Sequence, residues 1–162
     1  LSFSYKWLGE KKTHTYALPD FPGYSRDKHN DEKLVAKLAE VLSQADIVCG
    51  HNSTRFDDPT VNTRLLLHGH MPQLPFKVID TCKWARRVLK LPSNKLDDIG
   101  EYFGLGRKLK HTGKHLWLAC MNGDRKAFKL MKRYNAQDVV LLEKVYLKML
   151  PYIKLPKIKT LK

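Results

Sequence analysis

A carboxylate and a phenol share the apolar face of the helix that residues 124–150 predict, as one long helix or two joined ones. Positions three and four apart lie on one side of a helix, so Tyr134 and Asp138 continue the line of Leu141 and Val145. A carboxylate aimed at a protein core is strongly destabilising unless a partner neutralises it. An arginine, a set of backbone N–H groups or a metal ion could be that partner, and a simple salt bridge is the structural alternative.

A second group of polar residues follows a short apolar run at 45–50 (ADIVCG), which is typical of a buried parallel strand. Asn52 and Asp57 come just after it, and ligand-binding residues of α/β sheets lie at the carboxyl ends of strands. Asp58 precedes Pro59 and is predicted to cap the next helix. Asp57 has no such structural role, although a turn position for Asn52 and a solvated acid at Asp57 are the alternatives.

Two further residues lie near these predicted strand ends. Asp80 ends the next short apolar run, residues 75–81 (PFKVIDT). It faces the same site or caps the helix that follows at 82–91, and we favour the cap. His51 adjoins Asn52 and could touch a nucleotide, with a purely structural role as the alternative.

The chemistry that suits two carboxylates and a phenol is metal-assisted hydrolysis of a phosphodiester. Divalent ions neutralise the phosphate, lower the pKa of the attacking water and stabilise the leaving oxygen. The oxygens of Asp57 and Asp138 suit Mg²⁺ or Mn²⁺. Tyr134 could orient the water or the scissile phosphate, but a phenol with an ordinary pKa of about 10 is a poor base.

The charge of the chain indicates a polyanionic partner. Thirty Lys and Arg against sixteen Asp and Glu give a net charge of +14. Residues 107–133 hold nine Lys and Arg but one acid, and residues 144–162 hold six Lys and no acid. Nucleic acid is the natural partner, and a basic surface that only keeps the protein soluble is the alternative. Within this region we expect Arg107, Lys108 and Lys110 to contact phosphates.

The elements that must position these residues alternate between strands and helices. An antiparallel pair of strands leads into strands that are linked by helices, which predicts a mixed sheet with helices packed on it. The expected strands are 1–7, 13–18, 45–50 and 75–81, and the expected helices are 31–44, 60–68, 82–91, 93–103 and 124–150.

Composition limits the remaining possibilities. The 162 residues, 43% of them apolar, suffice for one domain, which we place at 1–153 with a basic tail at 154–162. No apolar run reaches the length of about 18 residues that a membrane span needs. Three cysteines without CxxC spacing favour reduced thiols and an intracellular, cytoplasmic setting.

Two stretches resemble motifs of the DEDD superfamily of 3′–5′ exonucleases, which have a ribonuclease H-like fold. Residues 50–57 (GHNSTRFD) are similar to its second motif, and residues 134–138 (YNAQD) are similar to the third motif of its tyrosine-bearing branch. The segments 78–87 and 95–106 resemble linking segments of predicted phage and bacterial members. The resemblance implies metal-ligand roles for Asp57 and Asp138 and a water-positioning role for Tyr134.

The resemblance implies an α/β fold, a ribonuclease H-like mixed sheet with helices on both faces. It also implies divalent-metal-dependent, two-metal 3′–5′ exonuclease activity on single-stranded DNA, in a bacterial or phage-infected cell. One departure is clear: the first motif of the family, Asp-x-Glu on an opening strand, has no counterpart here, so we expect that strand to be missing. Either the chain is a fragment of a longer gene product, inactive as given, or it has lost catalytic competence. A non-catalytic nucleic-acid-binding module with an exonuclease fold is therefore the alternative, and a protein-binding domain of the same fold is a weaker one.

Overall fold

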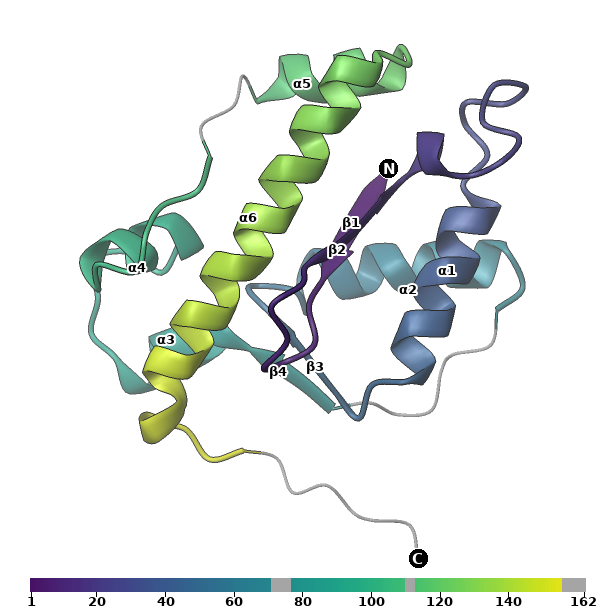
Figure 1. Cartoon of the computed structure of the whole chain (residues 1–162). Helices are drawn as coiled ribbons and strands as arrows, with labels where there is room; N and C mark the ends of the chain where they lie inside the picture. Colours follow the sequence, from purple (N-terminus) through teal and green to yellow (C-terminus); the bar gives the residue numbers. More distant parts are fainter. Residues whose placement is uncertain (71–76, 110–112, 156–162) are drawn as a thin grey trace, which may run out of the picture.

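The computed structural model describes residues 1–70, 77–109 and 113–155. Four strands, six α-helices and two 3₁₀ turns follow one another along these residues (Figure 1). In chain order they are β1 (Ser2–Tyr5), β2 (His14–Ala17), η1 (Leu18–Asp20), α1 (Glu32–Ser43), β3 (Ile47–Gly50), α2 (Asp57–Leu67), β4 (Lys77–Asp80), α3 (Thr81–Val88), α4 (Leu96–Tyr102), α5 (Lys114–Met121), α6 (Arg125–Met149) and η2 (Leu150–Tyr152).

The strands of the described residues form two separate two-stranded sheets. β1 and β2 are antiparallel, with Ser2 opposite Ala17, whereas β3 and β4 are parallel, with Gly50 opposite Asp80. The first sheet lies between α6 on one side and α1 on the other (Figure 1). The predicted mixed α/β class is therefore confirmed, although no strand among the described residues joins the two pairs into one sheet.

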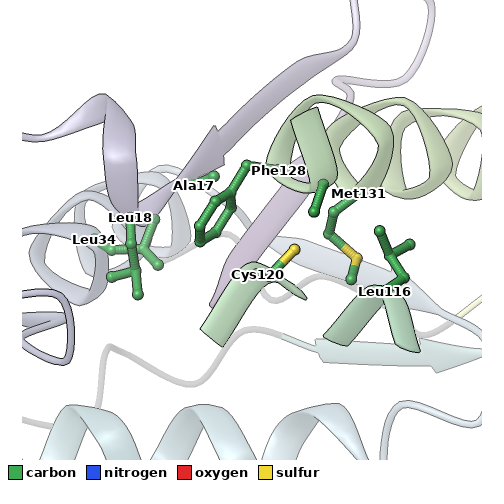
Figure 2. Packing of buried hydrophobic residues seen from close by; sticks show 8 residues of the cluster. Ala17, Leu18, Leu34, Leu116, Cys120, Phe128 and Met131 are labelled. Carbon is green, nitrogen blue, oxygen red and sulfur yellow. The ribbon is translucent and has the colours of Figure 1, made fainter. Parts of the chain in front are cut away.

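α6 links two hydrophobic clusters that lie at its two ends. The first cluster joins β2, α1, α5 and the N-terminal half of α6 through Ala17, Leu18, Leu34, Leu116, Cys120, Ala127, Phe128 and Met131 (Figure 2). The second joins α3, α4 and the C-terminal half of α6 through Ala85, Leu96, Ile99, Leu141, Val145 and Met149. The predicted stripe of Leu141, Val145 and Met149 is thus confirmed as core. Tyr134 and Asp138 lie on α6 between Met131 of the first cluster and Leu141 of the second.

Most of the predicted helices are present, and α6 is one continuous helix. The Asp124 carboxylate begins it by accepting hydrogen bonds from the N–H groups of Lys126 and Ala127. The predicted cap at Asp58 is wrong, because α2 already begins at Asp57 and Asp58 lies inside its first turn. The N–H of Asp58 is instead bonded to a backbone carbonyl of the preceding loop, which extends the helical turn backwards.

The residue at the cap position of α1 connects this helix to α2. Asp31 occupies the cap position without a capping hydrogen bond from its side chain. Its buried carboxylate pairs with Arg64 and with His68 Nε2 instead, so it ties α1 to α2. The Asn30 side chain accepts a hydrogen bond from the Glu32 N–H at the start of α1.

No helix among the described residues is long and apolar enough to cross a membrane. The predicted strand at 75–81 begins outside the described residues, and its described part is β4. Most of the predicted basic tail likewise lies outside the described residues, so the domain boundary at 153 stays a prediction.

Candidate functional site

Asp138 is neutralised by a lysine that comes from a distant loop. Lys108 Nζ lies 2.7 Å from Asp138 Oδ2 and 3.3 Å from the hydroxyl of Tyr134. The same ammonium lies 5.4 Å from the centre of the Tyr134 ring, within range of a cation–π interaction. Tyr134 and Asp138, the two residues that the sequence singled out on this helix, therefore share one cationic partner, Lys108.

The charge of Lys108 also reaches the second predicted ligand, Asp57. Asp57 is an exposed residue at the start of α2, yet the surrounding protein displaces enough water to raise its pKa. The negative charges of Asp58 and Asp80 raise the pKa further, whereas the charge of Lys108 lowers it. One ammonium therefore acts on both acids, although the two acids belong to different helices.

The loop that presents Asp57 is held by the carboxylate of Asp80. Asp80 is buried and accepts hydrogen bonds from the N–H groups of Asn52, Thr54, Cys82 and Lys83 and from the Thr54 hydroxyl. Burial alone would raise the pKa of Asp80, but these hydrogen bonds lower it below its ordinary value. The favoured expectation that Asp80 caps α3 is confirmed.

Asn52 and His51 lie in the same loop, between β3 and α2. Asn52 has a φ of +60°, a left-handed conformation that suits a turn position, which was its structural alternative. The His51 ring is engaged at both nitrogens, with Nδ1 2.8 Å from the Thr81 hydroxyl and Nε2 2.9 Å from the Asn94 carbonyl oxygen. Burial lowers the pKa of His51. The predicted nucleotide contact of His51 and the predicted substrate-binding role of Asn52 remain predictions.

Lys108 is positioned by the turn after α4. Its backbone N–H donates to Asp97 Oδ1 at 2.7 Å, and Arg107 holds the other oxygen of Asp97 at 3.0 Å. The hydrogen bond from Arg107, then that from the Lys108 backbone, lowers the pKa of Asp97. At Gly100 a Cβ would lie 2.6 Å from the Gly106 carbonyl oxygen, so only glycine lets this turn pack so closely on α4.

The basic residues predicted to bind phosphate differ in how the structure uses them. Arg107 is half exposed, and its guanidinium pairs with Asp97 and Glu101. Lys110 lies outside the described residues. Lys108 is half-buried, and although burial alone would lower its pKa, the hydrogen bond and charge of Asp138 raise it. Lys108 is therefore an ammonium ion already paired within the protein.

The sequence predicted that Asp138 has a partner but did not identify Lys108. The positions three and four residues from Asp138 on its own helix are Tyr134, Asn135, Leu141 and Leu142, none of which is cationic. A cationic partner therefore had to come from another element of the fold, and the sequence indicated no more than that. The suggested salt bridge is present, with a lysine in place of the suggested arginine.

The carboxylate oxygens of Asp57 and Asp138 are of the kind that a hard divalent cation prefers. The second carboxylate oxygen of Asp138 is buried and has no hydrogen-bond partner among the described residues, as expected of an atom that lacks a cation. Burial and the charges of Asp58 and Asp80 raise the pKa of Asp57. However, the described residues include no group of three or more His, Cys, Asp or Glu that could hold a metal ion. The roles of Asp57 and Asp138 as ligands of one metal ion therefore remain predictions.

Comparison with known proteins identifies the family of the chain. The family model of the RNase_H superfamily, whose members are generally nucleases, matches residues 4–150. The match includes Asp57, Lys108, Tyr134 and Asp138 together with the elements that carry them. No curated protein matches the chain. Since the family model covers most of the sequence, the chain belongs to the RNase_H superfamily.

Proposed function

We propose that this domain is a divalent-metal-dependent 3′–5′ exonuclease that removes nucleotides from single-stranded DNA. The observation that carries this proposal is the Asp138 carboxylate, which pairs with Lys108 beside the Tyr134 hydroxyl within residues that match a nuclease superfamily. Burial raises the pKa of Asp57, and the charge of Lys108 opposes this rise. Acids that gather around a positive charge in a nuclease superfamily are suited to a phosphodiester site.

Each residue of the site has a separate role in this proposal. Mg²⁺ or Mn²⁺ held by Asp57 and Asp138 would neutralise the scissile phosphate and lower the pKa of the attacking water. The Tyr134 hydroxyl lies beside the Asp138 carboxylate, bonded to the same ammonium, and from there it orients the water or a phosphate oxygen. Asp80 holds the loop before Asp57 in place, so it acts as a positioning residue.

The charge of the chain supports nucleic acid as the substrate. Among the described residues, the Lys and Arg of 107–133 lie in the turn that carries Lys108, at the start of α5 and in the first part of α6. Contacts from such residues to phosphates are independent of base sequence and weaken as salt increases. A single strand with a 3′ end is thereby guided to the site without recognition of particular bases.

The experiment that tests this proposal uses a 5′-labelled oligodeoxynucleotide with Mn²⁺. We expect a ladder of products shortened from the 3′ end, and a 3′-terminal phosphorothioate linkage should delay it. Asp138→Asn and Asp57→Asn should each lower the rate by about 10²-fold or more, and Tyr134→Phe should lower it by about 10-fold to 10²-fold. Shortening that both Asp variants retain would contradict the proposal.

A non-catalytic nucleic-acid-binding domain is the second candidate, and one observation favours it. Lys108 already neutralises Asp138, and the described residues supply no third ligand for a metal ion. Under this alternative the protein retains an oligonucleotide in a salt-sensitive manner, EDTA has no effect on retention, and no shortening occurs. Shortening that EDTA abolishes would instead support the exonuclease.

A further inference from the structure

The position of Lys108 suggests how the acidic site is controlled. Its Nζ lies 2.7 Å from Asp138 Oδ2, a distance typical of a charge-assisted hydrogen bond. We propose that Lys108 is the resident counter-cation of Asp138, and that it competes with a divalent ion for this carboxylate. This inference deepens the proposed function, because it concerns the same acid, and it adds a residue that sets the affinity of the site for cations.

The ammonium is held by more than a surface ion pair. Asp138 binds it on one side, the Tyr134 hydroxyl lies 3.3 Å away, and the Tyr134 ring faces it at 5.4 Å. Its backbone is fixed by the Asp97 carboxylate. The side chains of Lys108 and Asp138 are 29% and 22% exposed, so water screens the pair only in part. These contacts give Lys108 a defined position beside the carboxylate.

Competition follows from the shared oxygen. A divalent ion with oxygen ligands binds them at about 2.0–2.6 Å, and it cannot take Asp138 Oδ2 while the ammonium remains there. Like charges at this separation also repel. An ion on either oxygen of Asp138 is therefore bound more weakly while Lys108 remains beside the carboxylate. Once displaced, Lys108 is a free cation next to the site, where a phosphate oxygen of the substrate can become its new partner.

Another lysine–carboxylate pair on α6 provides a matched control. Lys132 Nζ lies 2.8 Å from Asp20 Oδ2, and these side chains are 33% and 35% exposed. This pair resembles the Lys108–Asp138 pair in type, distance and exposure, and its lysine lies on the same helix as Asp138. Lys132→Gln removes one positive charge from the protein without removing the cation at Asp138.

The test is Mn²⁺ binding, measured by electron paramagnetic resonance of the free ion, on the full chain without nucleic acid. We expect Lys108→Gln to bind Mn²⁺ about 5- to 10-fold more tightly than the unmodified chain, whereas Lys132→Gln binds it unchanged. The added affinity should disappear in the double variant Lys108→Gln/Asp138→Asn. Lys108→Arg, which keeps a cation, should retain the weak binding of the unmodified chain.

Two results would overturn the inference. One is an Mn²⁺ affinity of Lys108→Gln equal to or lower than that of the unmodified chain, in protein whose circular dichroism shows that it is folded. The other is an equal gain in Lys132→Gln, which would show a general effect of net charge. Because the titration contains no nucleic acid, its outcome does not depend on cleavage. A failed nuclease assay would thus leave this inference standing, and a failed titration would leave the nuclease assay to decide the activity.

Discussion

Lys108 Nζ and Asp138 Oδ2 lie 2.7 Å apart, although 30 positions separate the two residues in the sequence. The pair joins the turn after α4 to the middle of α6, in the part of that helix between its two hydrophobic clusters. It also leaves the other oxygen of Asp138 buried and without a hydrogen-bond partner among the described residues. The same residues thus stabilise the fold and form the proposed site.

Replacement of Asp138 should destabilise the fold modestly. Asp138→Asn removes the charge that neutralises Lys108, and we expect a loss of about 1 kcal/mol in the free energy of unfolding, because both side chains are partly exposed. Urea denaturation measures this loss. A double-mutant cycle with Lys108→Gln should show coupling between the two positions, and strictly additive changes would contradict the ion pair.

Asp57 should have the opposite effect on stability. Its pKa in the folded protein is raised above the ordinary value of 3.8, so its ionised form is disfavoured by folding. This penalty is present above the folded pKa and disappears as the pH falls below 3.8. Asp57→Asn should therefore stabilise the protein at pH 7 by a few tenths of a kcal/mol, a value kept small by the exposure of the side chain. Thermal unfolding measures the stabilisation by Asp57→Asn at pH 7 and its expected disappearance at low pH. If the variant is still more stable at low pH, the charge of Asp57 is not the cause of the stabilisation.

Asp80 should be the acid on which folding depends most strongly. Its pKa is lowered in the folded protein, so its contribution to stability is present above the unfolded pKa near 3.8 and is lost as the pH falls through the folded pKa. Asp80→Ala leaves several buried donors without an acceptor and should cost about 2–4 kcal/mol. Chemical denaturation measures this loss in the free energy of unfolding. Asp27→Ala, in an exposed turn, is the control. A loss below about 0.5 kcal/mol would contradict the cap.

Gly100 should control the placement of the turn that carries Lys108. A Cβ at this position would lie 2.6 Å from the Gly106 carbonyl oxygen and 2.8 Å from Leu141 Cδ1. Gly100→Ala is therefore expected to cost about 1–3 kcal/mol, despite the higher helix propensity of alanine. Tyr102→Ala, on the exposed side of the same helix, should change stability little. An unchanged melting temperature in Gly100→Ala would show that the turn can move freely.

Local patterns predicted the elements well because the decisive interactions are short-range. The spacing of Leu141, Val145 and Met149 indicated the buried face of α6, and Asp80 at the end of a strand indicated a cap. The prediction for Asp58 was wrong, because the turn before Pro59 is already helical and its donors are bonded to backbone carbonyls. Helix starts of this kind depend on the loop conformation, which short patterns do not encode.

The site was predictable in part, for the same physical reason. An acid on an apolar helix face needs a partner, so Asp138 could be singled out without any knowledge of the fold. The partner itself could not be predicted, because Lys108 reaches Asp138 only through the packing of Gly100 and the hydrogen bond to Asp97. The charge of the region around Lys108 indicated phosphate contacts, and it concealed the pairing of Lys108 with Asp138 within the protein.

The most direct test of a cation site shared by Asp57 and Asp138 is the crystal structure of Lys108→Gln soaked in Mn²⁺, with anomalous data. We expect an anomalous peak within about 2–2.6 Å of carboxylate oxygens of both acids. Such a peak would show that acids from α2 and α6 hold one cation. Absence of the peak, or an ion bound to one acid while the other points elsewhere, would contradict the shared site.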